Sequence, residues 1–281
     1  MSAAVSTLLR VLRSLRALAA ACHPGPTLAV TTLTGLLATA SGLGIRAGAL
    51  VVAAVFAGQL SIGWSNDLLD AARDRAIGRP DKPAARGAVT PAVLRACIVG
   101  ALLACVVLSF ACGMPSAATH LGLGVAAGWA YNLGLKATRW SALPYALAFG
   151  TLPAVVTLAG TPHRLPPAGV AVTAGLLGVA AHLFNALPDL ADDRATGVVG
   201  MPHRLGAHGT RLVGAVVLVI AALVSVIGSG GPMDLGAALR LSAALVLSAV
   251  VVRGPGRTPF IAVIGMAFLC LWQVAGVLAA R

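Results

Sequence analysis

Long apolar runs, separated by short polar connections, dominate this chain. Nine of them reach, or nearly reach, the roughly 20 residues that an α-helix needs to cross a bilayer. Backbone polar groups inside hydrocarbon must be paired within their own segment, so these runs are predicted to be transmembrane helices. Their approximate ranges are 27–43, 47–65, 91–112, 116–133, 141–160, 168–187, 210–229, 234–252 and 259–279.

Charged residues are too few to cover a water-soluble surface. They make up 10% of the 281 residues, against about 25% in soluble domains. The expected fold is therefore all-α: a polytopic protein of the lipid bilayer, with nine transmembrane helices around a central cavity. Residues 27–281 are expected to form a single domain. Residues 1–26 carry Arg10, Arg13 and Arg16 on one helical stripe and are expected to form an interfacial helix and its lead-in.

The placement of basic residues predicts the orientation of the chain. The formal net charge is +12, but Lys and Arg lie between apolar runs rather than in the dense stripes of nucleic-acid-binding proteins, so no nucleic-acid partner is expected. With the N-terminus in the cytoplasm, 16 of the 20 Lys and Arg lie in or beside cytoplasmic segments. The positive-inside rule then places the C-terminus outside.

The acidic residues fall into two stretches that repeat each other. The chain has no Glu and eight Asp, and seven of these lie in two stretches that leave the cytoplasmic ends of the second and sixth predicted spans. The first reads Asn66-x₃-Asp70-x₃-Asp74-Arg75-Ala76-x-Gly78. The second, 119 residues later, reads Asn185-x₃-Asp189-x₃-Asp193-Arg194-Ala195-x-Gly197.

This repeat predicts a metal-diphosphate site. Steps of four residues rotate by only about 40° around an α-helix, so each set should form one polar stripe that ends at a glycine. Carboxylate and amide oxygens suit Mg²⁺, which binds few protein ligands together with substrate phosphates. We therefore expect both stripes to face one cavity at the cytoplasmic end. Nearby basic residues could neutralise the remaining phosphate charge: Arg75, Arg79, Lys82, Arg86, Lys136, Arg139, Arg194 and Arg204.

Ordinary solvated loops are the simpler alternative for these stretches. Helix capping and helix-end charges could explain one acidic cluster, but they do not explain two copies with the same register. The stripes also begin at or inside the predicted span ends. Because a carboxylate at the bilayer centre costs about 2.5–3.5 kcal/mol on insertion scales, these groups should face a wet or ion-filled cavity.

The chain resembles the UbiA superfamily of intramembrane prenyltransferases in several motifs. Asn66-Asp67-Leu68-Leu69-Asp70-x₃-Asp74 is similar to the first motif of that family, NDxxDxxxD, and Asp189-x₃-Asp193 is similar to its second, DxxxD. Lys82-Pro83-Ala84-Ala85-Arg86-Gly87 resembles its basic-proline stretch. Tyr131-x₄-Lys136 resembles its YxxxK element, with one extra intervening residue.

The resemblance implies an enzyme in which Mg²⁺ holds an isoprenyl diphosphate. Ionisation would give an allylic cation in an apolar chamber, and an acceptor, usually an activated aromatic ring, would attack it. The implied metal ligands, with Asn185 added from the repeat, are Asn66, Asp70, Asp74, Asn185, Asp189 and Asp193. The implied catalytic residues are Asp67, Tyr131 and Lys136. The implied diphosphate-binding residues are Arg75, Lys82, Arg86, Lys136 and Arg194.

Three alternatives to an aromatic prenyltransferase stay open at this point. The same site could belong to an intramembrane terpene cyclase, in which the cation is quenched by its own double bonds. It could also transfer the prenyl group to a polar, non-aromatic acceptor. A transporter is a different class, but transporters place their charges near the bilayer centre and often use broken helices. The carboxylates here gather at one face, which disfavours a transporter.

Overall fold

A computed structural model describes residues 3–79, 81–228 and 235–279. Within these ranges every regular element is a helix and no strand occurs, so the predicted all-α class is confirmed. The first half contains α1 (Ala3–Ala21), α2 (Pro24–Ala40), α3 (Ile45–Ala76), α4 (Pro91–Ala111), α5 (Met114–Thr119), η1 (His120–Val125), α6 (Ala126–Asn132) and η2 (Leu135–Ala137). The second half contains α7 (Leu143–Thr157), α8 (Ala168–Ala186), η3 (Leu187–Asp189), α9 (Leu190–Ala195), α10 (Met201–Gly228), α11 (Leu235–Arg253) and α12 (Thr258–Ala279).

Within the described residues, each predicted apolar range overlaps a helix or a continuous run of helices; residues 229 and 234, at the ends of two ranges, lie outside the described residues. The range 116–133 is a composite of α5, the π-helical η1 and α6. Among the described residues, five helices are long and apolar enough to cross a membrane: α3, α4, the run from α8 to α9, α10 and α11. Two shorter apolar helices, Leu143–Thr157 and Thr258–Cys270, accompany them. The chain is therefore built as an integral membrane protein.

The first acidic stripe lies on one uninterrupted helix, as its spacing predicts. α3 runs for 32 residues, well past the predicted end of its apolar range, and carries Asn66, Asp70 and Asp74 on its last turns. The helix ends at Ala76, and Gly78 follows with a φ of 69°. Glycine adopts this left-handed conformation without the steric cost that a Cβ brings, so it ends the helix where the sequence predicts.

The second stripe departs from the expectation of a single helix. α8 ends at Ala186, a 3₁₀ turn covers Leu187–Asp189, and α9 begins at Leu190. Pro188 lies in this turn and has no N–H with which to continue the α-helical hydrogen bonds, which explains the change. Asn185, Asp189 and Asp193 therefore lie on three successive elements rather than on one.

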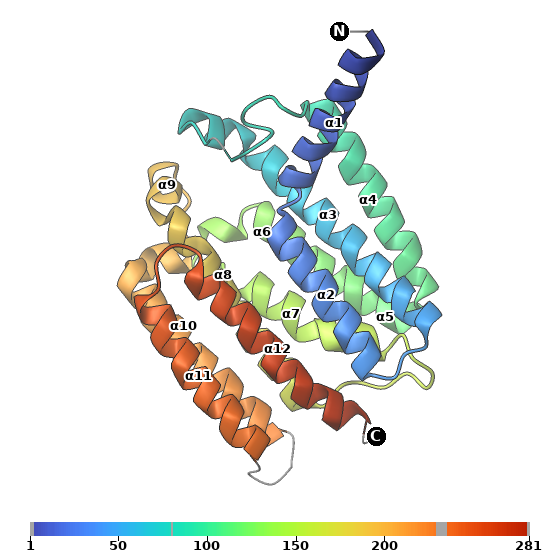
Figure 1. Cartoon of the computed structure of the whole chain (residues 1–281), viewed down its shortest axis with the longest axis vertical. Coiled ribbons are helices and arrows are strands. Elements are labelled where there is room, and N and C mark those ends of the chain that lie inside the picture. Colours follow the sequence, from blue (N-terminus) through green and yellow to red (C-terminus); the bar gives the residue numbers. More distant parts are fainter. Residues whose placement is uncertain (1–2, 80, 229–234, 280–281) are drawn as a thin grey trace.

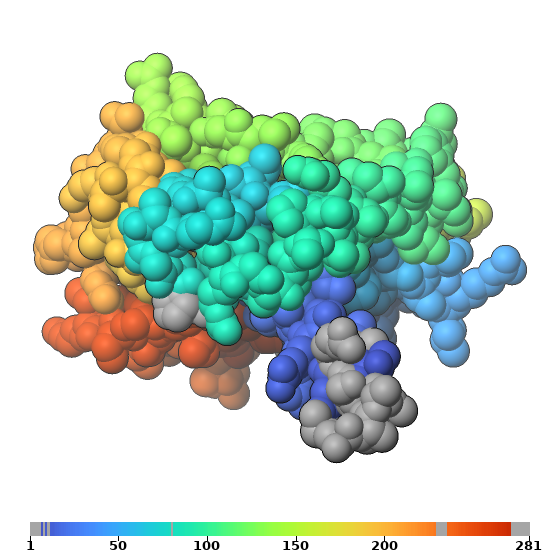
Figure 2. All heavy atoms as spheres, turned by 90° about the horizontal axis from the view of Figure 1, so that it is seen from above, coloured from blue at the N-terminus to red at the C-terminus, as the bar shows by residue number. Residues whose placement is uncertain are grey.

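The elements that carry both stripes meet at one end of the molecule. Figure 1 shows α1 and α9 at this end, together with the connection between α3 and α4, while α12 ends at the opposite end. Seen from the α1 end, the α3–α4 connection (cyan to teal) lies against the segment around α9 (gold) in Figure 2. At the centre of the bundle α8 packs against α7, α10 and α12. This packing places the second stripe beside the first.

The N-terminal helix is anchored to α3 directly before the first stripe begins. The indole Nε1 of Trp64 donates a hydrogen bond of 2.9 Å to the carbonyl oxygen of Leu18. Ala21 is completely buried. At Gly63 the backbone of α3 lies so close to Cys22 that a Cβ would overlap the Cys22 carbonyl group. The absence of a side chain at Gly63 therefore allows the chain to turn from α1 into α2.

We predict that Gly63→Ala lowers the thermal stability of the purified protein. The added methyl group must displace the backbone of Cys22, and overpacking of this kind costs about 1–3 kcal/mol. Gly100→Ala is the matched control, because a Cβ at Gly100 meets nothing within 4 Å. Melting in detergent should show a lower Tm for Gly63→Ala and an unchanged or slightly higher Tm for Gly100→Ala. Equal Tm values would contradict the close approach.

Candidate active site

A polar cavity of about 170 Å³ lies where both acidic stripes end. Its walls come from the ends of α3, α6 and α8, from η2, η3 and α9, from the connection that follows α3, and from residues of α2, α7 and α10. Ten of the residues singled out in the sequence line this cavity: Asn66, Asp70, Asp74, Arg79, Lys82, Tyr131, Lys136, Asn185, Asp189 and Asp193. Residues more than 100 positions apart thus share one compartment.

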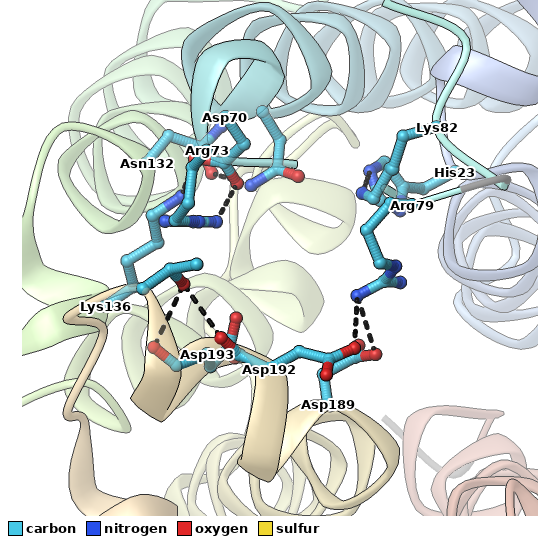
Figure 3. Close-up of polar contacts among 12 residues, drawn as sticks. His23, Asp70, Arg73, Arg79, Lys82, Asn132, Lys136, Asp189, Asp192 and Asp193 are labelled. Carbon is cyan, nitrogen blue, oxygen red and sulfur yellow. Dashed lines mark hydrogen bonds and ion pairs between the residues drawn. The ribbon is translucent and has the colours of Figure 1, made fainter. Parts of the chain in front are cut away.

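Asp70 is the most heavily paired carboxylate of the first stripe. It accepts a short hydrogen bond from the Lys136 ammonium group. Arg73 Nη2 lies 2.8 Å from its other oxygen. All three side chains lie at the cavity wall (Figure 3). One turn further along α3, Asp74 is also buried, and its Oδ2 atom has no hydrogen-bond partner in the structure.

Arg79 connects the two halves of the site. Its Nε and Nη2 atoms each donate to Asp81 over 2.9 Å. Its Nη1 atom lies 3.0 Å from Asp189 Oδ1 of the second stripe (Figure 3). The guanidinium group holds the pKa of Asp81 at about 2, so that carboxylate stays charged. Asp192 lies 3.9 Å from the same guanidinium group but does not line the cavity.

His203 lies beside the last carboxylate of the second stripe. Its Nδ1 atom accepts a hydrogen bond of 3.1 Å from the Gly200 amide. In the neutral ring the proton is then on Nε2, which lies 3.3 Å from Asp193 Oδ2. Arg194 donates a short hydrogen bond to the His203 carbonyl oxygen. These contacts place the His203 ring beside Asp193 at the edge of the cavity.

Two lysines supply positive charge from different elements. Lys136 lies on η2 and is 9% exposed; burial lowers its pKa, although the Asp70 carboxylate opposes this shift. Lys82 lies on the connection between α3 and α4, with its Nζ atom 3.2 Å from His23 Nε2. Burial and the Lys82 charge lower the pKa of His23 to about 4, so His23 is neutral near pH 7 and can accept a hydrogen bond from Lys82.

The residues of the polar cavity fit a divalent cation that is bound together with a phosphate-bearing substrate. Their carboxylate and amide donors are all hard oxygens, and the Asp74 oxygen is buried without a partner. Within the described part of the chain, no three His, Cys, Asp or Glu side chains converge tightly enough to hold a metal unaided. Mg²⁺ usually binds through one or two carboxylates together with substrate oxygens.

An apolar chamber of about 140 Å³ adjoins the polar cavity. Pro26, Tyr145 and Asn185 line both compartments. The chamber extends between α2, α7, α8 and α12 and is lined mainly by aliphatic and aromatic side chains, such as Val30, Leu177 and Val263. A ligand with a charged head and an apolar tail could therefore lie across the boundary at Tyr145.

A sequence model of the UbiA prenyltransferase family matches residues 28–280, which is most of the chain. The chain belongs to this family. No curated protein sequence gives a significant match. Family membership confirms the resemblance seen in the paired motifs and places the chain among the prenyltransferases.

Solved structures of UbiA proteins have the same fold at low sequence identity. A UbiA homologue from Aeropyrum pernix K1 aligns with a TM-score of 0.73 at 16% identity, covering 89% of this chain and 97% of that one. A UbiA homologue from Archaeoglobus fulgidus, bound to GPP and Mg²⁺, gives 0.69 at 13% identity, with coverage of 94% and 99%. A structure of digeranylgeranylglyceryl phosphate synthase gives 0.65 at 15% identity, with coverage of 95% and 98%.

Four residues that the UbiA resemblance implicates lie outside the lining of the polar cavity. Asp67 is buried, and its Oδ2 atom accepts a hydrogen bond of 2.9 Å from the Ala84 amide. Arg75 donates to the Ala85 carbonyl oxygen over 3.1 Å. Both contacts hold the α3–α4 connection against α3. Arg86 is exposed on that connection, and Arg194 bonds the backbone near α9, as described above.

The cavity also contains residues that sequence reasoning did not select, including His23, Arg73, Asn132 and Tyr145. Arg73 lies one turn after Asp70, so helical spacing could have found it. Tyr145 packs edge-on against Tyr131, with ring centroids 5.2 Å apart, and lies 4.9 Å from the His182 ring. It stands inside an apolar run without a motif, so only the packing of α7 against α8 places it at the site.

We predict that Lys136→Gln raises KM for the prenyl diphosphate by about tenfold or more. The substitution removes a buried cation at the cavity wall, and hydrogen bonds to charged groups contribute about 1.5–3 kcal/mol. Arg139→Gln is the control, since Arg139 is exposed and its guanidinium group stacks on Trp140. Unchanged kinetics in Lys136→Gln, at matched expression and folding, would contradict a role in diphosphate binding. Lys136 would then serve only as a basic residue of the positive-inside distribution.

Proposed function

We propose that this UbiA-family protein transfers an isoprenyl group from a Mg²⁺-bound isoprenyl diphosphate to an acceptor, with an activated aromatic ring as the leading acceptor class. The supporting observation is the pairing of two compartments. The polar cavity gathers oxygen donors from both acidic stripes, and the apolar chamber begins at Tyr145 beside it. The archaeal homologue bound to GPP and Mg²⁺ has the same fold.

The charge balance of the polar cavity supports an anionic substrate that arrives with divalent cations. Four carboxylates and four basic side chains line it: Asp70, Asp74, Asp189 and Asp193, with Arg73, Arg79, Lys82 and Lys136. Bound Mg²⁺ would stabilise the negative charge that develops on the leaving diphosphate. The carboxylates would then face metal ions, while Arg79 and Lys136 would be free to contact phosphate oxygens.

The aromatic side chains at the boundary suit an allylic cation. Tyr145 lines both the polar cavity and the chamber, and Tyr131 packs edge-on against it from the polar cavity. A cation over an aromatic face is attracted by the ring quadrupole, by about 2 kcal/mol or more when water is excluded. The apolar walls of the chamber would limit access of water, which would otherwise quench the cation.

The proposed topology has nine transmembrane helices, with the N-terminus and both stripes in the cytoplasm and the C-terminus outside. The positive-inside distribution supports it, and α1 and the end of α12 lie at opposite ends of the molecule (Figure 1). Residues 1–26 would lie at the membrane surface. In α1, Leu9, Leu12 and Leu15 are exposed, as a helix that inserts one face into the bilayer requires.

One assay distinguishes the proposed transferase from the alternatives. Purified protein is incubated with a labelled isoprenyl diphosphate and Mg²⁺, with and without an aromatic acceptor. A prenylated acceptor supports the proposal. A cyclic hydrocarbon formed without acceptor would identify a cyclase, and a product formed only with a polar acceptor would exclude the aromatic class. Recovery of intact diphosphate in every reaction would overturn the transferase function.

We predict that Asp70→Ala and Asp193→Ala each lower turnover at least about 100-fold while the protein still folds in the membrane. Losing a group that stabilises the leaving diphosphate should cost about 3 kcal/mol or more. Asp192→Ala is the matched control, since Asp192 lies next to Asp193 but outside the cavity lining. It should keep turnover within a few-fold of the unaltered enzyme. Normal turnover in either of the first two variants would remove that residue from the ligand set.

A further inference from the structure

The apolar chamber is followed by a second, smaller apolar space. This distal cavity has a volume of about 60 Å³ and is lined by residues such as Leu37, Leu152 and Thr173. Four residues line both spaces and therefore form the wall between them: Leu33, Phe149, Leu177 and Ala267. Phe149 is the largest of the four. The polar cavity, the chamber and the distal cavity thus follow one another, with Tyr145 at the first boundary and Phe149 at the second.

The helical period of α7 places these two aromatic rings in line. Residues four apart lie on the same helix face, one turn from each other. The rings of Tyr145 and Phe149 are nearly parallel, with an interplanar angle of 8° and centroids 6.3 Å apart. On the other side, Gly178 of α8 approaches so closely that a Cβ there would lie 2.8 Å from Phe149 Cβ. α8 and Tyr145 therefore restrict the positions that the Phe149 ring can take.

The size of the chamber limits the tail that it can hold. An engineered apolar cavity of about 150 Å³ holds benzene, a six-carbon ligand. The chamber, at about 140 Å³, therefore has space for about one five-carbon isoprene unit. A further unit next to the diphosphate, at the Tyr145 boundary, gives a tail of about ten carbons before Phe149 is reached.

We propose that Phe149 sets the length of the donor and that this enzyme uses short isoprenyl diphosphates, of five or ten carbons. The proposal rests on the prenyl-transfer function proposed above. Removing the ring joins the chamber to the distal cavity, which opens space for a longer tail. A role in core packing alone would change stability without changing the order of preference among donors.

The test compares diphosphates with five-, ten-, fifteen- and twenty-carbon tails in the purified enzyme. The unaltered protein should show kcat/KM at least tenfold higher with the ten-carbon than with the twenty-carbon donor. Phe149→Ala, or Phe149→Leu if the first variant folds poorly, should lower that ratio at least tenfold. Ala148→Leu, which fills the chamber only, should shift preference towards five carbons. Phe110→Ala, at a ring that is 52% exposed on α4, should leave the profile unchanged.

Binding of thiolodiphosphate analogues, which do not release the allylic cation, separates the two proposals. Selectivity by tail length that changes in Phe149→Ala supports the role of Phe149, even where turnover is slow. Binding that does not depend on tail length, or a profile unchanged by Phe149→Ala, overturns that role and leaves prenyl transfer intact. If no analogue of any length binds in the presence of Mg²⁺, both proposals fail.

Discussion

The pairing of buried carboxylates with basic side chains is the constraint on which the rest of this structure depends. A charge at the edge of hydrocarbon is costly unless it is paired or faces a polar cavity, and removing one partner of a buried pair leaves an uncompensated charge. Asp70 is held by Lys136 and Arg73, and Asp189 by Arg79. These pairs join η2 and the α3–α4 connection to the acidic stripes. Because pairing offsets the cost of burying the charges, these contacts hold the walls of the polar cavity together.

Helix geometry delivers those charges to one end of the bundle in two different ways. α3 is continuous, so Asp70 and Asp74 follow the four-residue spacing along one face. After α8 the chain turns through a 3₁₀ segment at Pro188, and Arg79 bonds Asp189 within this turn. The two copies of one sequence pattern therefore have different backbone conformations. Arg79, which follows the first copy, contacts the second.

The division into a charged compartment and an apolar one follows from the packing of α7 against α8. Gly178 lets the two backbones approach closely beside Tyr145 and Phe149. Tyr145 then separates charge from hydrocarbon, and Phe149 closes the far side of the chamber. In the proposed reaction, the steps that need Mg²⁺ and phosphate and the steps that need a dry environment would thus take place in adjoining compartments.

The sequence by itself determined the helical class, the apolar ranges and the carboxylates of the site, because hydrophobic runs and four-residue spacing are local properties. It also led to Lys136 and Tyr131 through family motifs. Only the tertiary structure decided that Tyr145 and His23 reach the polar cavity and that Asp67 and Arg75 hold a connection beside it. The direction of a side chain depends on which helices approach one another, and here close contacts at Gly63 and Gly178 set those approaches. Such contacts join residues far apart in the chain, so no local pattern contains them.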